Sequence, residues 1–365
     1  MRLLRQITTI FALLLTSCMR WEYGEQEHFN LLGEGMFVTN EGNFTFGGAS
    51  LSFYDPEGRH IENEMFYRAN AMKLGDVAQS MVVRDGVGWI VVNNSHVVFA
   101  IDVETLREVG RITDLPSPRY ICFVSDEKAY ISQLDSDRLI IVNSKKFEVT
   151  GEIVCPMTTA YRTGSTEQMV IVGDYLYVVC WSYQRRILKI DTRTDEVVDY
   201  VDIGVQPKSI VADRNGKLWV VSDGGYEDNV IGYEASRLYR IEPEGLEVER
   251  EFELGKSGTG NATRTASRLK INDAGDTIYW IDGGVWRMSI EAEELPAEPF
   301  IRPTMTGSMP SLYYALGVAP DTEEVYVGDA LDYQQRSIIY RYSREGELLD
   351  TFTAGVIAGD FCWKR

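Results

Sequence analysis

The sequence repeats a unit of four short strands. Within residues 164–204, the stretch 168–172 is an apolar run, 175–181 is rich in β-branched and aromatic residues, and 186–190 and 196–203 alternate in polarity. A period of two is typical of a strand with one buried face. Turn residues separate the stretches at Gly173-Asp174 and at 191–194, where Asp and Thr side chains can bond their own backbone. Four antiparallel strands in about forty residues correspond to one blade of a β-propeller.

Two markers recur with this unit. The first is the apolar residue that ends the third strand together with the turn after it, found at 54–58, 101–105, 142–146, 190–194, 241–245, weakly at 288–292, and at 342–346. Successive copies start 41 to 54 residues apart. The second is an aromatic residue that opens each expected second strand: Phe37, Trp89, Tyr130, Tyr177, Trp219, Tyr279 and Tyr326. Both markers count seven, which predicts an all-β, seven-bladed propeller rather than a helical solenoid. The alternative is a β-sandwich whose spacing is coincidental.

The two ends of the chain are expected to share a blade. The pattern at Phe37 is already that of a second strand, so blade one lacks a first strand at its N-terminal side. Residues 358–363 near the C-terminus resemble a first strand. Because an open blade leaves unpaired strand edges, we expect this segment to complete blade one.

The N-terminus resembles a lipoprotein signal. Residues 1–5 are basic, residues 7–15 form a short apolar run, and Leu15-Thr16-Ser17-Cys18 matches a lipobox. We expect three parts: a signal peptide at 1–17, a lipidated acidic tether at 18–34 anchored by Cys18, and the propeller at 35–365. An ordinary signal peptide with an incidental cysteine is the alternative. An acidic cluster after the lipid cysteine resembles the surface-export signal of Bacteroidetes lipoproteins, which implies a lipid-anchored protein on the outer face of the outer membrane.

The composition argues against nucleic acids and anionic surfaces as partners, and the sequence has few residues in patterns typical of catalysis. The formal net charge of −19 argues against binding nucleic-acid backbones or anionic surfaces. The three histidines, His28, His60 and His96, have no metal-ligand spacing and no nucleophile motif beside them. Of the cysteines after Cys18, all four are best interpreted as small buried apolar residues, although one disulfide is possible in an exported protein. We therefore expect no metal, no catalytic residues and no catalytic cofactor, and a binding protein rather than an enzyme.

The candidate binding residues lie on two sets of loops that crowd one face of a propeller. Loops after the second strands contribute Asn40, Phe44, Phe46, Asn93, Asn94, Gln133, Trp181, Tyr183, Gln184, Asp223, Tyr226, Trp286, Asp329, Tyr333 and Gln334. Loops that lead into the innermost strands contribute Gln79, Arg119, Glu167, Gln168, Lys208, Arg268 and Tyr314. Amides supply donors and acceptors, and Tyr and Trp supply flat apolar faces with a polar handle. Such a surface suits a large, flat ligand decorated with amides or hydroxyls, although any one Asn or Asp can instead cap a turn.

Several strings of residues carry a family resemblance. The segment FVTNEGN at 37–43 is close to the signature of YVTN-type propellers. A narrower likeness rests on VTNEGNF, ASLSFYDPEG, YRANAMKLGDVAQSMVVRDGVGWIVVNNS, GSTEQMV, CWSYQRRILKIDT, DALDYQQRSIIYRYS and the terminal FCWK. These strings resemble the cobalamin-binding surface lipoproteins of gut Bacteroidetes, the BtuG type, from about Gly35 to the C-terminus.

The resemblance implies a protein that captures cobalamin outside the cell and hands it to a BtuB-like TonB-dependent outer-membrane transporter. The Gly/Ser-rich segment 255–261 and the extended segment 302–310 look like departures from this pattern. Three other functions stay open: glycan binding for a polysaccharide-uptake system, a propeller lactonase or hydrolase with a calcium ion near Asn40, Asn93 or Asp282, and a scaffold that binds only protein.

Overall fold

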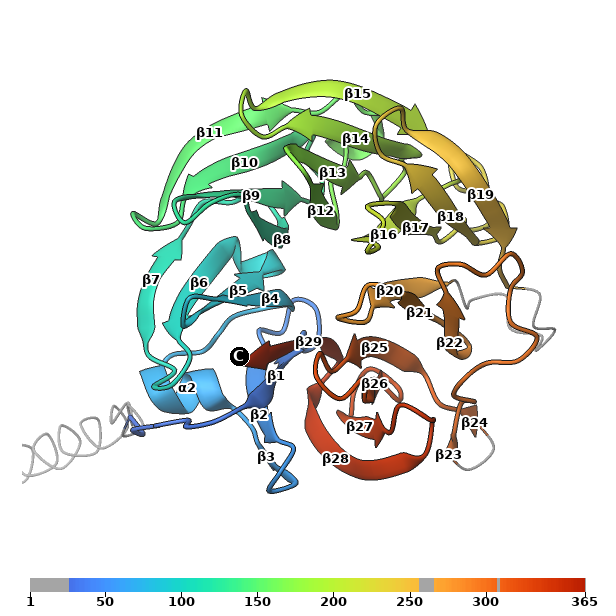
Figure 1. Ribbon diagram of the computed structural model, residues 1–365. Coiled ribbons are helices and arrows are strands. Elements are labelled where there is room, and N and C mark those ends of the chain that lie inside the picture. Colours follow the sequence, from blue (N-terminus) through green and yellow to red (C-terminus); the bar gives the residue numbers. More distant parts are fainter. Residues whose placement is uncertain (1–25, 256–265, 307–308, 365) are drawn as a thin grey trace, which may run out of the picture.

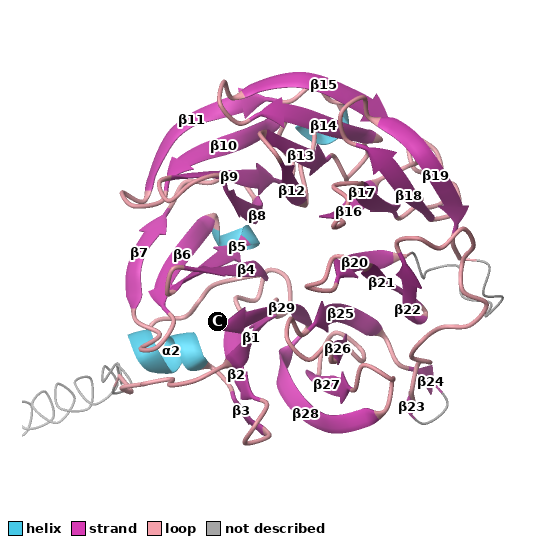
Figure 2. Cartoon of the chain, in the orientation of Figure 1, coloured by secondary structure: helices cyan, strands magenta, loops and turns pink. Residues whose placement is uncertain are grey.

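The strands form a ring of seven antiparallel sheets, one for each repeat (Figure 1, Figure 2). The computed structural model describes residues 26–255, 266–306 and 309–364. The predicted all-β, seven-bladed propeller is confirmed. The expected signal peptide, the lipidation site Cys18 and most of the segment 255–261 lie outside the described residues.

Each blade is ordered from the central channel outward. Blade one contains β29 (Ala358–Lys364), β1 (Gly35–Asn40), β2 (Ser50–Asp55) and β3 (His60–Glu62). Blade two contains β4 (Ala78–Arg84), β5 (Val87–Val92), β6 (Val97–Asp102) and β7 (Glu108–Ile112). Blade three contains β8 (Pro118–Phe123), β9 (Lys128–Gln133), β10 (Arg138–Asn143) and β11 (Glu148–Val154). Blade four contains β12 (Met169–Val172), β13 (Tyr175–Val179), β14 (Arg186–Asp191) and β15 (Glu196–Asp202).

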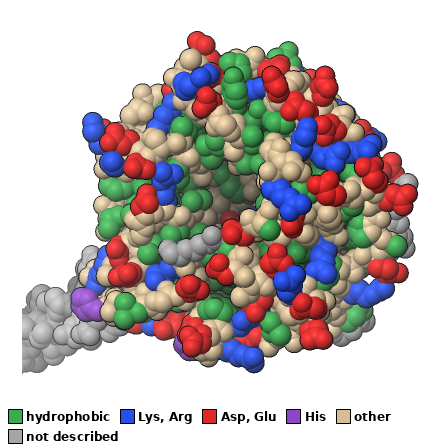
Figure 3. Space-filling view, viewed as in Figure 1, with side chains coloured by type: hydrophobic (Ala, Val, Ile, Leu, Met, Phe, Trp, Pro, Cys, Tyr) green, Lys and Arg blue, Asp and Glu red, His purple; other side chains and the backbone are tan. Residues whose placement is uncertain are grey.

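The remaining blades follow the same order. Blade five contains β16 (Pro207–Ala212), β17 (Leu218–Ser222), β18 (Arg237–Glu242) and β19 (Glu247–Glu253). Blade six contains β20 (Ser267–Ile271), β21 (Thr277–Asp282) and β22 (Gly284–Ser289). Blade seven contains β25 (Tyr313–Val318), β26 (Val325–Asp329), β27 (Arg336–Tyr342) and β28 (Leu348–Val356). The innermost strands contact one another around the ring, and the surface is hollowed at its centre in Figure 3.

The two sequence markers have separate structural roles. The aromatic markers are buried on the second strands, where apolar clusters fill the space between neighbouring blades. The turn marker places a side-chain oxygen at the end of each third strand, where it accepts a backbone N–H two residues on, or three residues on in blade three. The seven acceptors are Asp55, Asp102, Asn143, Asp191, Glu242, Ser289 and Ser343. This local bond explains why the turn is recognisable in the sequence.

Blade one is closed by the C-terminal strand, as predicted. β29 pairs antiparallel with β1, and Phe37 lies opposite Cys362. Phe361 packs against Tyr326 of blade seven, so β29 also ties the last blade to the first.

Blade six departs from the four-strand pattern. In place of a fourth strand among the described residues, Ile301 forms an isolated bridge with Val285 of β22. The extended segment 302–310 contains a small hairpin of β23 (Met305–Thr306) and β24 (Met309–Pro310). The hairpin falls within the segment 302–310 that the sequence identifies as a departure from the family pattern, and the Ile301 bridge lies directly before that segment.

The chain enters the ring beside blade two. The short helix α2 (Met65–Asn70) buries Met65, Phe66 and Ala69 against β2. Its Arg68 pairs with Glu27 and Glu62 at 2.6 and 2.7 Å, so the described end of the tether lies against the propeller. No helix among the described residues is both long and apolar enough to cross a membrane.

Candidate functional site

A ring of β-bulges carries the polar side chains at the channel. The register shifts by one residue at the start of β4, β8, β16, β20 and β25, and the residues left unpaired there include Gln79, Arg119, Lys208, Arg268 and Tyr314. A bulge leaves its extra residue outside the ladder and redirects the side chain. In blade four, Glu167 lies just before β12. We call Gln79, Arg119, Glu167, Lys208, Arg268 and Tyr314, together with Glu41 and Asp360, the throat.

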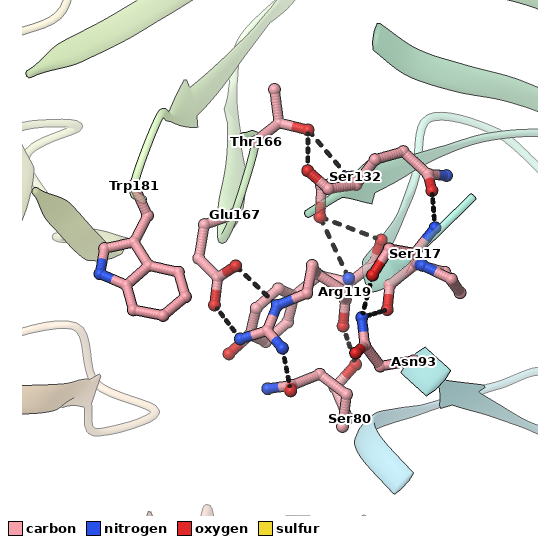
Figure 4. A network of polar contacts seen from close by, with 12 residues as sticks. Ser80, Asn93, Ser117, Arg119, Ser132, Thr166, Glu167 and Trp181 are labelled. Carbon is pink, nitrogen blue, oxygen red and sulfur yellow. Dashed lines mark hydrogen bonds and ion pairs between the residues drawn. The ribbon is translucent and has the colours of Figure 1, made fainter. Parts of the chain in front are cut away.

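Arg119 and Glu167 form the central ion pair of the throat (Figure 4). Arg119 Nε and Nη2 each donate to Glu167 at 2.8 Å, and Nη1 donates to Gln79 Oε1 at 2.5 Å. The Glu167 side chain is 1% exposed and that of Arg119 is 10% exposed. Burial disfavours the charge on Arg119, but Glu167 outweighs this effect, so the pKa of the guanidinium lies above its ordinary value. A bidentate pair of this kind fixes the geometry of both side chains.

A second charged group lies on the opposite part of the ring. Tyr314 Oη donates to both carboxylate oxygens of Glu41, at 3.1 and 3.0 Å. Arg268 Nε donates to the carbonyl of Tyr314 at 2.9 Å, and Nη2 lies 3.5 Å from Glu41. Burial, and then the Glu41 charge, raise the pKa of the Tyr314 phenol, so this side chain stays neutral. Asp360 pairs with Lys270 at 2.8 Å.

Trp181 lies between these charges and the loops. Its Nε1 donates to Asp223 Oδ2 at 2.8 Å, while Asp223 Oδ1 accepts from Gln206 Nε2 and from the Gly225 N–H. The face of the indole lies 4.2 Å from Lys208 Nζ and 5.6 Å from the Arg119 guanidinium carbon. Two cations therefore share one aromatic ring whose position is fixed by Asp223.

Exposed aromatic residues gather on the loops around the throat. Phe44 and Phe46 are 63% and 83% exposed, and Tyr161, Tyr226 and Tyr333 are also exposed. The hydroxyls of Tyr183 and Tyr226 lie 2.8 Å apart, and the ring of Tyr161 packs edge-on against Tyr183. We call Phe44, Phe46, Tyr161, Tyr183, Tyr226 and Tyr333 the aromatic rim. Apolar surface of this extent on one face is typical of a binding site.

Many of the predicted amides and carboxylates serve as internal ties. Asn40 is 0% exposed, donates to Ser50 and Ser52, and accepts the Gly355 N–H. The others with at least one side-chain hydrogen bond to the protein are Asn93, Asn94, Gln133, Gln168, Gln184, Asp223 and Asp329. Each holds a loop to a neighbouring strand or loop. These side chains therefore have the structural role that Asn and Asp often have in turns, in place of a free binding group. We therefore build the site on the throat and the aromatic rim.

Two predicted residues lie apart from both groups. Trp286 donates from Nε1 to the Asp282 carbonyl and lines a cavity of about 250 Å³ beside Trp280 and Leu254. Gln334 is exposed on the loop that carries Tyr333.

Four residues of the throat region are absent from the sequence-based set. They are Glu41, Tyr120, Asp360 and Lys270. In blade one the extra residue of the corresponding bulge is Gly359, and Asp360 is the residue after it, paired with Thr39. Tyr120 follows Arg119 inside the same bulge, and burial raises its pKa to about 12.

Metal binding would need His, Cys, Asp or Glu side chains, and thiol chemistry would need a reactive cysteine. No group of three or more His, Cys, Asp or Glu residues in the described ranges has the arrangement of a metal site. Cys122, Cys155, Cys180 and Cys362 are free thiols. Cys155 and Cys180 are buried as expected, whereas Cys122 and Cys362 are half-buried. Desolvation raises the pKa of Cys122, Cys155 and Cys362 to about 12.

Comparison with known proteins supports the fold. The family model described as "Domain of unknown function (DUF5074)" matches residues 34–354, and no curated protein matches. A quinonprotein alcohol dehydrogenase-like protein from Bacteroides thetaiotaomicron VPI-5482 is similar in structure, with a TM-score of 0.65, 12% identity, and coverage of 90% of this chain and 77% of that one.

Two further solved structures are similar over most of both chains. A periplasmic gluconolactonase from Pseudomonas aeruginosa has a TM-score of 0.64 at 11% identity, covering 91% of this chain and 99% of its own. A protein from Lactobacillus plantarum has a TM-score of 0.67 at 10% identity, with the same coverage. Identities this low establish a shared propeller fold and nothing about activity.

Proposed function

The chain belongs to the DUF5074 family, and we propose that this member is a binding protein that captures a corrinoid such as cobalamin at the face formed by the throat and the aromatic rim. The ligand is then passed to a BtuB-like TonB-dependent transporter of the outer membrane. In this proposal the protein is anchored at the cell surface by a lipid on Cys18 and catalyses no reaction.

The observation that carries the proposal is the coincidence of two surfaces on one face. Flat aromatic side chains stand at the rim, and fixed charges and amides lie in the throat inside it. A corrinoid combines a flat macrocycle with a fringe of amide side chains. The macrocycle can pack against Tyr and Phe rings, and the amides can exchange hydrogen bonds with Arg, Lys and carboxylate groups.

The rigidity of the site favours tight binding. Two hydrogen-bonded pairs are already formed without a ligand: Arg119 with Glu167, and Tyr314 with Glu41. Side chains that are already ordered lose little conformational entropy on association. A preorganised face of this kind is consistent with capture of a dilute nutrient.

Glycan binding is the second candidate function. The exposed Tyr183–Tyr226 pair, with hydroxyls 2.8 Å apart, offers the aromatic platform and polar handle that sugars also use. This candidate predicts binding to oligosaccharides through the rim alone, with no involvement of the throat. A scaffold that binds only protein is a third candidate, but that function would not explain the buried charges of the throat.

Calorimetric titration tests the proposal. The ring comprises residues 35–364, so a chain that begins at Met19 retains every contact described above. Titration of this chain with cyanocobalamin is expected to give one-to-one binding. A flat titration at micromolar protein, together with binding to a glycan array, would refute corrinoid capture in favour of the second candidate.

A further inference from the structure

One cation of the throat has no acceptor. Arg119 pairs with Glu167, Arg268 with Glu41, and Lys270 with Asp360. Lys208 Nζ has no hydrogen-bond or ion-pair partner among the described residues. Its nearest recorded contact is the Trp181 ring, 4.2 Å away.

The carboxylate nearest to Lys208 is already in use. Asp223 attracts the ammonium through space, but its oxygens accept from Trp181 Nε1, Gln206 Nε2 and the Gly225 N–H. Moving Lys208 onto Asp223 would disturb the bond that positions Trp181. The ammonium is therefore held beside an indole face instead of in an ion pair.

The Lys208 ammonium has donors free for a ligand. Lys208 is half-buried, so an acceptor that enters the throat can reach the three N–H donors of its ammonium. Burial lowers the pKa of Lys208, and Arg268 and Arg119 add repulsion. Groups kept in such unfavourable states cluster at functional sites.

We propose that Lys208 binds an anionic phosphate oxygen of the ligand, with Trp181 holding the ammonium in place. This inference rests on the proposed function, since a complete corrinoid carries one phosphodiester, in its nucleotide loop. Lysine is a common phosphate ligand because it acts as a compact point charge. Arg119 and Arg268 are each paired with a carboxylate, so among the described throat residues Lys208 is the cation whose donors are left for an anionic oxygen.

Binding of two corrinoids to matched variants tests the inference. Cyanocobalamin contains the phosphodiester, and dicyanocobinamide lacks the whole nucleotide loop. Displacement titrations compare the wild type, Lys208→Met, and Lys73→Met, which makes the same change at an exposed lysine before β4. We expect Lys208→Met to weaken cyanocobalamin by roughly 10- to 100-fold, because a charged hydrogen bond is lost. We expect little change for dicyanocobinamide, and none for either ligand with Lys73→Met.

The outcomes separate this inference from the proposed function. Equal weakening of both corrinoids by Lys208→Met, or no weakening of either, would overturn the phosphate contact while corrinoid capture stands. If the wild type binds neither corrinoid, the proposed function fails. Inorganic phosphate then provides the remaining arm, read by intrinsic tryptophan fluorescence. A Lys208-dependent response supports an oxyanion site, and a response that is absent or independent of Lys208 rejects it.

Discussion

Arg119 of blade three and Glu167 of blade four face each other across a blade junction, with two nitrogens and two oxygens paired at 2.8 Å. The residues are 48 positions apart in the sequence. Each is the polar residue at the start of its own innermost strand, so the pair joins two repeats as well as forming part of the throat.

Breaking this pair is expected to destabilise the fold. Glu167→Gln leaves Arg119 buried without a counter-charge, which typically costs about 3 to 5 kcal/mol of unfolding free energy. Glu152→Gln is the control, because Glu152 pairs with Arg138 while both side chains are about half exposed. An exposed pair contributes less than about 1 kcal/mol. Denaturant unfolding of the two variants measures the difference, and equal losses would contradict this account of the throat.

The aromatic rim is expected to contribute affinity and little stability. Phe46 is 83% exposed, so Phe46→Ala should leave the unfolding midpoint unchanged. Its affinity for cyanocobalamin should fall roughly tenfold, which corresponds to a contact worth about 1.4 kcal/mol. Tyr200→Ala is the control, since Tyr200 is 50% exposed on the outer strand β15. The rim has no role in binding if both variants retain wild-type affinity.

Lys208 should impose a pH-dependent penalty on the folded state. Its folded pKa lies below the ordinary 10.5, mainly because of burial, so the folded protein binds fewer protons than the unfolded chain between these two values. Stability therefore rises with pH across that alkaline window. Lys208→Met removes the penalty, so it should be more stable than the wild type at neutral pH. The gap should narrow as the pH rises through that window and disappear above 10.5, which thermal unfolding of both proteins measures. A gap that widens would reverse the sign of this argument.

The four cysteines should be reduced and slow to react. Burial raises the pKa of Cys122, Cys155 and Cys362 to about 12, so the nucleophilic thiolate is scarce at pH 8. A chain that begins at Met19 should take up almost no iodoacetamide when folded. It should take up four equivalents in guanidinium without a reductant. Uptake of two equivalents in guanidinium would reveal a disulfide instead.

The repeat was readable from the sequence because its signals are local. A turn acceptor such as Asp102 accepts an N–H two residues away, and a core residue such as Trp89 lies on a short strand that has no polar side chain. The closure by β29 was also predictable, since the count of strands left one place empty. Strand count and blade order depend on these local signals alone.

The division of the candidate site was not readable in the same way. Residues at equivalent places, such as Asn93 and Trp181, have different roles: one ties a loop through Ser117 and the other faces the throat. The direction in which the Arg119 or Lys208 side chain points depends on a bulge. A bulge adds one extra residue to the strand and has no fixed sequence signal. Contacts such as Tyr314 to Glu41 span 273 positions and follow only from the closed ring.

The pairing of β29 with β1 also links folding to translation. The Thr39 hydroxyl donates to the carbonyl of Asp360, which lies 321 positions later in the chain. During synthesis β1 is therefore made long before the strand that pairs with it. A chain that stops early keeps an unpaired strand edge, and such edges recruit other strands or proteases. The ring can close only after β29 has been synthesised, so a closed propeller requires a chain that extends at least to this strand.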